Sequence, residues 1–167
     1  TGSTILTDVE ALSHGTLFWR SFSHWIGGMG VLVFAMAVLP MTDGRAMHLM
    51  RAEVPGPTYG KISSKLSDSA KILYAIYLAM TVLETVLLCA GGMPLFDSLI
   101  HSFGTAGTGG FSNKALSVGA YNDPYFEIVI GVFMLLFGVN FNLYYFLLLR
   151  HFKEAFASEE LHVYLGI

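Results

Sequence analysis

The chain has 167 residues, of which 54% are hydrophobic and only 13% are charged. A soluble domain usually carries about 25% charged residues, and a disordered chain is polar and highly charged. The composition therefore excludes a disordered protein and argues against an ordinary soluble one. The formal net charge is −3, which gives no sign of the basic surface that nucleic-acid binding requires. We expect no nucleic-acid partner.

Three apolar segments are long enough to cross a bilayer, which takes about 20 residues. They cover residues 17–40, 70–90 and 125–149. A shorter apolar segment, 94–103, would form a helix about 15 Å long, half the thickness of a bilayer. Such a length is typical of a re-entrant half-helix. The sequence therefore predicts an all-α membrane protein whose spanning helices contact membrane lipid.

The positive charges predict which side of the membrane faces the cytoplasm. Seven of the nine Lys and Arg residues lie between the first two spans, at the start of the second span, or after the third. The other two, Arg20 and Lys114, lie on the opposite side. Segment 41–69 is therefore predicted to be a cytoplasmic connector, and 151–167 the cytoplasmic start of the next segment.

A glycine-rich loop, residues 104–112, follows the predicted half-helix directly. It reads Gly-Thr-Ala-Gly-Thr-Gly-Gly-Phe-Ser and contains four glycines. Irregular backbone at membrane depth is tolerated only where it is buried in protein or lines a watery cavity, and inward-turned carbonyl groups can replace the hydration shell of a cation. A phosphate-binding loop is the first alternative, but such a loop ends in Gly-Lys-Ser/Thr. A flexible exterior loop is the second.

A faint internal repeat relates the two ends of the chain. An offset of 108 residues places Gly2 on Gly110, and in both copies a small-residue loop precedes a spanning helix. The predicted unit is a span, a re-entrant pore helix, a filter loop and a second span. Internal repeats are a common plan for membrane transport proteins. We expect an incomplete fragment, with the tail of one unit in 1–40 and a complete unit in 70–150.

Five motifs in the chain together point to one family. They are Thr1-Gly-Ser-Thr-Ile-Leu-Thr-Asp8, Phe18-Trp-Arg-Ser-Phe-Ser-His-Trp-Ile-Gly-Gly-Met-Gly30, Arg51-Ala-Glu-Val-Pro-Gly-Pro57, His101-Ser-Phe-Gly-Thr-Ala-Gly-Thr-Gly-Gly-Phe-Ser112 and Asn140-Phe-Asn-Leu-Tyr-Tyr145. Their content and order resemble the Trk-type bacterial potassium uptake proteins of the Trk/Ktr/HKT superfamily. The resemblance covers essentially the whole chain.

The resemblance implies a potassium-channel-like pore of four non-identical units in one chain, each giving one loop to a single selectivity filter. Carried onto this sequence, the ion-binding carbonyl groups belong to Thr1, Gly2, Thr108, Gly109 and Gly110. The second loop reads Thr-Gly-Gly-Phe instead of the more common Thr-Thr-Gly-Phe. The implied function is potassium uptake, with K⁺ as the transported ion, no organic cofactor and no enzymatic step.

The resemblance also implies partners and a location. The expected assembly is a homodimer in the bacterial inner membrane, with a cytoplasmic nucleotide-binding regulatory subunit docked on its inner face.

Arg20 and Glu84 are candidates for supporting the filter or facing the pore. Arg20 could pair with Asp8 or Glu10 and steady the mouth of the filter, or it could extend to lipid headgroups. Glu84 lies inside a predicted span, where a carboxylate is a functional candidate by default. It could line the ion path or form hydrogen bonds behind the filter.

Asn140 and Asn142 are two further candidates, because a polar amide in the membrane needs a partner. They are two positions apart and cannot fully share a helix face. One is expected to face the pore and the other a neighbouring helix. His24 has no second histidine or cysteine at metal-ligand spacing, so no transition-metal site is predicted.

Two other classes of protein compete with a cation pathway. A non-conducting binding or sensory subunit would not need the glycine loop. An intramembrane serine protease would need a nucleophile with a positioned base. Ser102 lies beside His101, and Ser112 lies in the loop, but the spacing suggests no triad with either.

Overall fold

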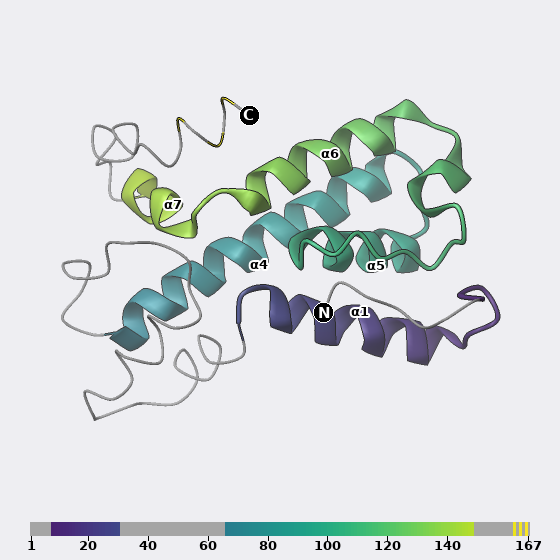
Figure 1. The fold of residues 1–167 in the computed structure, drawn as a ribbon, viewed down its shortest axis with the longest axis horizontal. Coiled ribbons are helices and arrows are strands. Elements are labelled where there is room, and N and C mark those ends of the chain that lie inside the picture. Colours follow the sequence, from purple (N-terminus) through teal and green to yellow (C-terminus); the bar gives the residue numbers. More distant parts are fainter. Residues whose placement is uncertain (1–7, 31–65, 149–161, 163, 165, 167) are drawn as a thin grey trace. The chain divides into compact units, whose positions relative to one another are not determined.

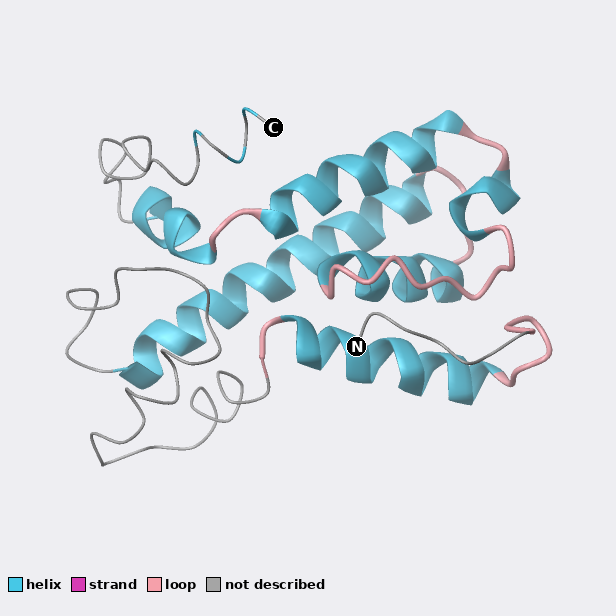
Figure 2. Cartoon of the chain, viewed as in Figure 1, coloured by secondary structure: helices cyan, strands magenta, loops and turns pink. Residues whose placement is uncertain are grey.

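The computed structural model describes residues 8–30, 66–148, 162, 164 and 166, except for the side chains of residues 66–69, 142, 145 and 146. The described elements are helical and no strand occurs among them (Figure 2). They are α1 (His14–Gly28), α4 (Leu66–Ala90), α5 (Leu95–Ala106), the short 3-10 helix η1 (Ser117–Tyr121), α6 (Pro124–Gly138) and α7 (Phe141–Leu148). Figure 1 shows their order along the chain.

The chain divides into two compact units. The first contains residues Thr1–Met29 and Tyr77–Phe137, and the second contains Gly30–Ile76 and Gly138–Ile167. The first unit holds α1, the C-terminal part of α4, α5, η1 and all but the last residue of α6. The glycine-rich loop belongs to this unit, so the site can be described within it.

Helix α1 covers the first part of the predicted span 17–40 and ends at Gly28, which corrects the prediction of one continuous helix through residues 29 and 30. The helix begins after Ser13, whose side chain accepts the backbone N–H of Thr16 as an N-cap. It ends at Gly28, and Gly30 has a φ of 87°. A residue in this left-handed region just past a helix end is a common stop. Residues 31–40 lie outside the described part of the chain.

Helix α4 contains the predicted second span. Residues Ala70–Ala90 have a mean hydropathy of 2.0, and among the described helices this is the one long and apolar enough to cross a membrane. The helix itself begins at Leu66, earlier than the predicted residue 70. The shorter helix α6 is also apolar.

The predicted span 125–149 is not one continuous helix. Helix α6 ends at Gly138, and α7 starts at Phe141, where the N–H of Leu143 donates to the carbonyl of Asn140 at 2.9 Å. Glycine has a low helix propensity, and the polar Asn140 follows the break. The apolar run was therefore read correctly as helical, but its interruption was missed.

Helix α5 (Leu95–Ala106) is the predicted half-helix 94–103, but both of its ends lie closer to the loop than predicted. Pro94 is its N-cap, and the helix continues to Ala106 instead of ending at residue 103. The Thr105 hydroxyl donates to the His101 carbonyl at 2.9 Å, and the Gly107 N–H donates to the Phe103 carbonyl at 3.0 Å. These bonds make the first three residues of the predicted loop 104–112 the last turn of the helix.

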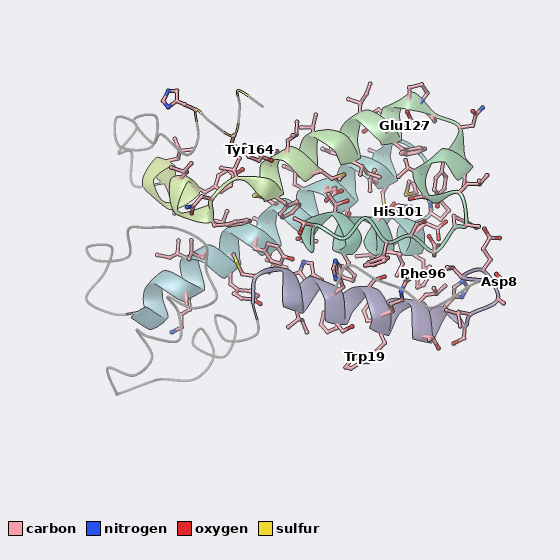
Figure 3. All side chains as sticks on the ribbon, in the orientation of Figure 1. Asp8, Trp19, Phe96, His101, Glu127 and Tyr164 are labelled. Atoms are coloured by element: carbon pink, nitrogen blue, oxygen red, sulfur yellow. The ribbon has the colours of Figure 1, made fainter. Side chains whose placement is uncertain are left out.

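Aromatic side chains pack α1 against α5. Trp25 stacks on Tyr77 of α4 at 5.2 Å between ring centroids, and Phe103 of α5 lies within 6 Å of Phe18, Phe22 and Trp25. Trp19, in contrast, is 68% exposed and points away from this packing (Figure 3). An exposed indole of this kind suits contact with lipid at a membrane interface.

Candidate functional site

The loop after α5 turns back onto the end of its own helix. The backbone N–H groups of Gly109 and Gly110 both donate to the carbonyl of Gly104, at 3.0 and 3.1 Å. Thr108 and Gly110 have positive φ angles of 55° and 66°. Glycine adopts this region easily, whereas threonine is uncommon there. The surrounding structure holds the Thr108 backbone in this conformation.

The same hydrogen bonds fix the direction of two carbonyl groups. None of the described peptide bonds is cis, and in a planar trans peptide the C=O points opposite to the following N–H. The N–H groups of Gly109 and Gly110 point to Gly104, so the carbonyl groups of Thr108 and Gly109 point away from α5. Thr108 and Gly110 are exposed. The loop thus presents consecutive carbonyl oxygens on its outer side, beside the partially negative C-terminal end of a helix.

His24 of α1 fills the space behind the loop. Its ring lies against Gly107 and Gly109, and a Cβ atom at either glycine would overlap that ring. It also contacts Phe111 edge-on, at 5.3 Å between centroids. Gly107 and Gly109 therefore allow the loop to pack closely on His24. Gly110 differs from them, because a Cβ atom at this position would meet nothing within 4 Å.

Arg20 of α1 contacts the far end of the loop. Its guanidinium donates to the Ser112 carbonyl at 3.4 Å and lies 4.7 Å from the centroid of the Phe111 ring. The two expected acidic partners have other contacts. Asp8 accepts the N–H groups of Glu10 and Ala11, and the Glu10 carboxylate accepts the N–H of Ala115 at 3.1 Å.

His101 and Ser112 form a hydrogen bond that the sequence did not predict. His101 Nδ1 is 2.7 Å from the Asp97 carbonyl oxygen, and its Nε2 is 2.9 Å from Ser112 Oγ. A carbonyl only accepts, so Nδ1 carries the proton and Nε2 accepts from the serine. Ser112 Oγ in turn accepts the N–H of Lys114 at 2.9 Å.

This pair is a structural tie. Both residues are buried, and the orienting group on His101 is a main-chain carbonyl instead of a carboxylate. The Ser112 hydroxyl also accepts a backbone N–H, so its bond to the buried His101 ties the loop to α5. No sequence signal identified the contact, because it joins residues on opposite sides of the loop.

The Asp97 carboxylate bridges two residues that follow the loop. Its Oδ1 accepts from Asn113 Nδ2, and its Oδ2 accepts from the Tyr121 hydroxyl at 2.6 Å. Burial, and then the bond to Asp97 and its charge, raise the pKa of Tyr121 above its usual range. The phenol therefore remains a donor at neutral pH.

Glu84 is fully buried and lies between α4 and α5. Its carboxyl oxygens have no partner within hydrogen-bond distance in the structure, and the side chain interacts with Thr105 of α5. Glu84 thus faces α5 and does not lie on an exposed face.

The remaining predicted site residues lie outside the described part of the first unit. Thr1 and Gly2 lie outside the described residues, as does the side chain of Asn142, and Asn140 belongs to the other compact unit. Among the side chains that the structure describes, no group of three or more His, Cys, Asp or Glu is arranged to hold a metal ion.

Comparison with a solved structure defines the class of protein. The chain superimposes on the crystal structure of the potassium transporter TrkH from Vibrio parahaemolyticus with a TM-score of 0.65 and 32% identity, over 86% of this chain and 28% of that one. The fold is accordingly that of an all-helical, multi-pass membrane protein.

Sequence comparison gives the family. Residues 1–163 match the TrkH family, described as "Cation transport protein", and the chain belongs to this family. It is 38% identical to the Trk system potassium uptake protein TrkH of Salmonella typhimurium and 37% identical to TrkG of Escherichia coli strain K12, over its whole length in both cases. The chain spans about a third of each relative, 35%.

Proposed function

We propose that this chain is part of a potassium uptake protein and contributes the Thr108–Gly110 segment to its selectivity filter. The observation that carries the proposal is the pair of carbonyl groups, of Thr108 and Gly109, that point away from α5. Such oxygens can replace the hydration shell of K⁺. The C-terminal end of α5 adds a favourable partial charge, and an inside-negative potential favours uptake by about 2.3 kcal/mol per 100 mV.

The order of elements supports the proposed repeat. A long apolar helix, α4, is followed by the short α5, the loop and the apolar α6, which corresponds to a span, a pore helix, a filter loop and a span. In this scheme residues 70–150 are one complete unit and residues 1–40 are the end of the preceding one. Thr1 and Gly2 would then belong to the preceding filter loop, and the missing units would complete a four-loop filter.

The proposed roles of the supporting residues follow their contacts. Arg20 holds the end of the loop through Ser112 and Phe111. Glu84 supports α5 from behind, since it is fully buried beside that helix. For Asn140 and Asn142, a pore-facing role for at least one remains a prediction from the sequence.

The proposed setting is the bacterial inner membrane, in keeping with the bacterial origin of the relatives. The proposed partners are a second copy of the protein, membrane lipid and a cytoplasmic nucleotide-binding regulatory subunit, and the proposed cargo is K⁺. Segments 41–69 and 151–167 carry the positive charges that would face the regulator.

The test uses the full-length protein and its regulator in bacteria that lack their own potassium uptake systems. Gly110→Ser is expected to abolish rubidium uptake or to admit sodium. Its side chain has space, but a left-handed backbone costs an L-residue about 1–2 kcal/mol. The loop would relax and move the neighbouring carbonyl groups. The measurements are growth at limiting potassium and uptake of rubidium and sodium.

Gly119→Ser is the matched control. Gly119 is exposed in η1, has open space where a Cβ atom would lie and does not have a positive φ. Its substitution should leave uptake unchanged. Wild-type uptake by Gly110→Ser would remove the filter assignment. No uptake by membrane-inserted wild-type protein with its regulator would favour the non-conducting class.

A further inference from the structure

Asp97 connects the pore helix to the chain that leaves the loop. Backbone hydrogen bonds attach the loop to α5 as far as Gly110. Beyond that point the Phe111 backbone packs on Gly104, and the described hydrogen bonds to α5 are made by side chains. Asp97 contributes both carboxylate oxygens to them, one to Asn113 and one to Tyr121. Asn113 comes three residues after Gly110, so a change in its position is transmitted directly to the proposed filter.

The chemistry of the three groups makes this connection specific. Two donors converge on one carboxylate, which is an acceptor when ionised. The Asn113 amide is oriented with its nitrogen toward Asp97, because the opposite orientation would place two oxygens together. Asn113 is buried, at 7% exposure, and its Oδ1 has no hydrogen-bond partner in the structure. The carboxylate is therefore the partner that holds this side chain.

A second set of contacts also joins α5 to the residues after the loop. The His101 ring joins the Asp97 carbonyl to Ser112 Oγ, and the Tyr121 ring packs edge-on against His101 at 5.7 Å between centroids. Asp97 thus reaches Ser112 through its main chain and Asn113 through its side chain. Figure 3 labels His101 on α5.

We propose that Asp97, bridging Asn113 and Tyr121, is a positioning residue that sets the ion selectivity of the filter. The inference rests on the proposed filter function. Discrimination between cations depends on the placement and number of carbonyl groups, and these follow the path of residues 108–113. Asp97 does not touch the ion. It keeps the exit of the loop from moving when ions of different size occupy the site.

The decisive variant is Tyr121→Phe, which removes one hydroxyl and keeps the ring that packs on His101 and Phe126. One hydrogen bond is lost, so the ratio of rubidium to sodium uptake by the full-length protein should fall about threefold to tenfold, which corresponds to the net strength of a typical protein hydrogen bond. Asp97→Asn should lower the ratio further. The double variant should be no worse than Asp97→Asn alone, because both changes remove the same connection.

Tyr125→Phe is the matched control. Tyr125 also donates its hydroxyl, at 2.9 Å, but to the Leu87 carbonyl on α4, away from the loop. The uptake ratio of this variant should equal that of the wild type. Membrane-inserted protein is quantified for every variant, so that a change in selectivity is distinguished from a change in the amount of protein.

Three results would overturn the inference. An unchanged ratio in Tyr121→Phe and Asp97→Asn would overturn it while leaving the filter in place, provided that Gly110→Ser still alters uptake. A proportional loss of rubidium and sodium uptake would show a purely structural role. An equal change in Tyr125→Phe would show that the effect is not specific to Asp97. If Gly110→Ser also has no effect, the proposed function itself fails.

Discussion

At the scale of single residues, the loop is shaped by what lies behind it. His24 occupies the volume that a side chain at Gly107 or Gly109 would need, and Phe111 covers the other edge of the ring. The glycine-rich composition has two separate reasons here. Gly110 has a positive φ, whereas at Gly107 and Gly109 there is no room for a Cβ atom.

Gly109→Ala is expected to reduce rubidium uptake, because its Cβ would overlap the His24 ring and overpacking costs about 1–3 kcal/mol. His24→Ser should relieve the overlap with the histidine ring but not the approach to Phe111, 2.9 Å from the same Cβ position, so the double variant should recover part of the uptake lost in Gly109→Ala. A double-mutant cycle in the full-length protein measures the coupling. Strictly additive losses would contradict the packing described for His24.

At the scale of elements, hydrogen bonds join α1 to α4 within the first unit. The Trp25 indole donates to Thr81 Oγ1 at 3.0 Å, and the Tyr77 hydroxyl donates to the Trp25 carbonyl at 2.9 Å. A separate close approach of backbones joins α1 to the end of α5. A Cβ on Gly28 would lie 2.7 Å from the Cα of Gly107, and small residues allow such packing of membrane helices.

Thr81→Val keeps the side-chain shape but removes the acceptor of the Trp25 indole. The expected cost is about 1–3 kcal/mol, because a buried donor loses its partner. The apparent melting temperature of the detergent-solubilised full-length protein should fall. Thr85→Val is the control, since the Thr85 hydroxyl bonds to the Thr81 carbonyl within α4. Equal shifts in both variants would argue against the contact between helices.

At the scale of the whole molecule, the chain is about a third of the length of its relatives. A four-loop filter therefore requires residues outside this sequence. The charge distribution still predicts a topology, with the loop exit at Lys114 outside and segment 41–69 inside.

Cysteine labelling of the full-length protein in intact cells tests this topology. In a Cys89→Ser background, Ala115→Cys should react with a membrane-impermeant maleimide from outside, because Ala115 is exposed. Lys61→Cys should react only after permeabilisation. Any other endogenous cysteines of the full-length protein are replaced first. Reversed accessibility would contradict the orientation.

The sequence by itself determined the membrane class, the order of the main apolar helices and the position of the glycine loop. These features depend on local composition and on apolar run lengths, which are visible in the residues. It also indicated the family, since several motifs appear in order. Helix ends were less predictable: α5 continues through Gly104, because hydrogen bonds of Thr105 and Gly107 extend it.

Only the tertiary structure decided which groups support the loop. Arg20 contacts Ser112 across 92 positions of sequence, whereas the sequence suggested nearby acidic partners. His101 with Ser112, and Asp97 with Asn113 and Tyr121, are likewise joined by the turn of the chain after α5. Pairing at such separations is set by packing and chain direction. Local patterns do not carry that information, because each side chain has several possible partners until the helices are in place.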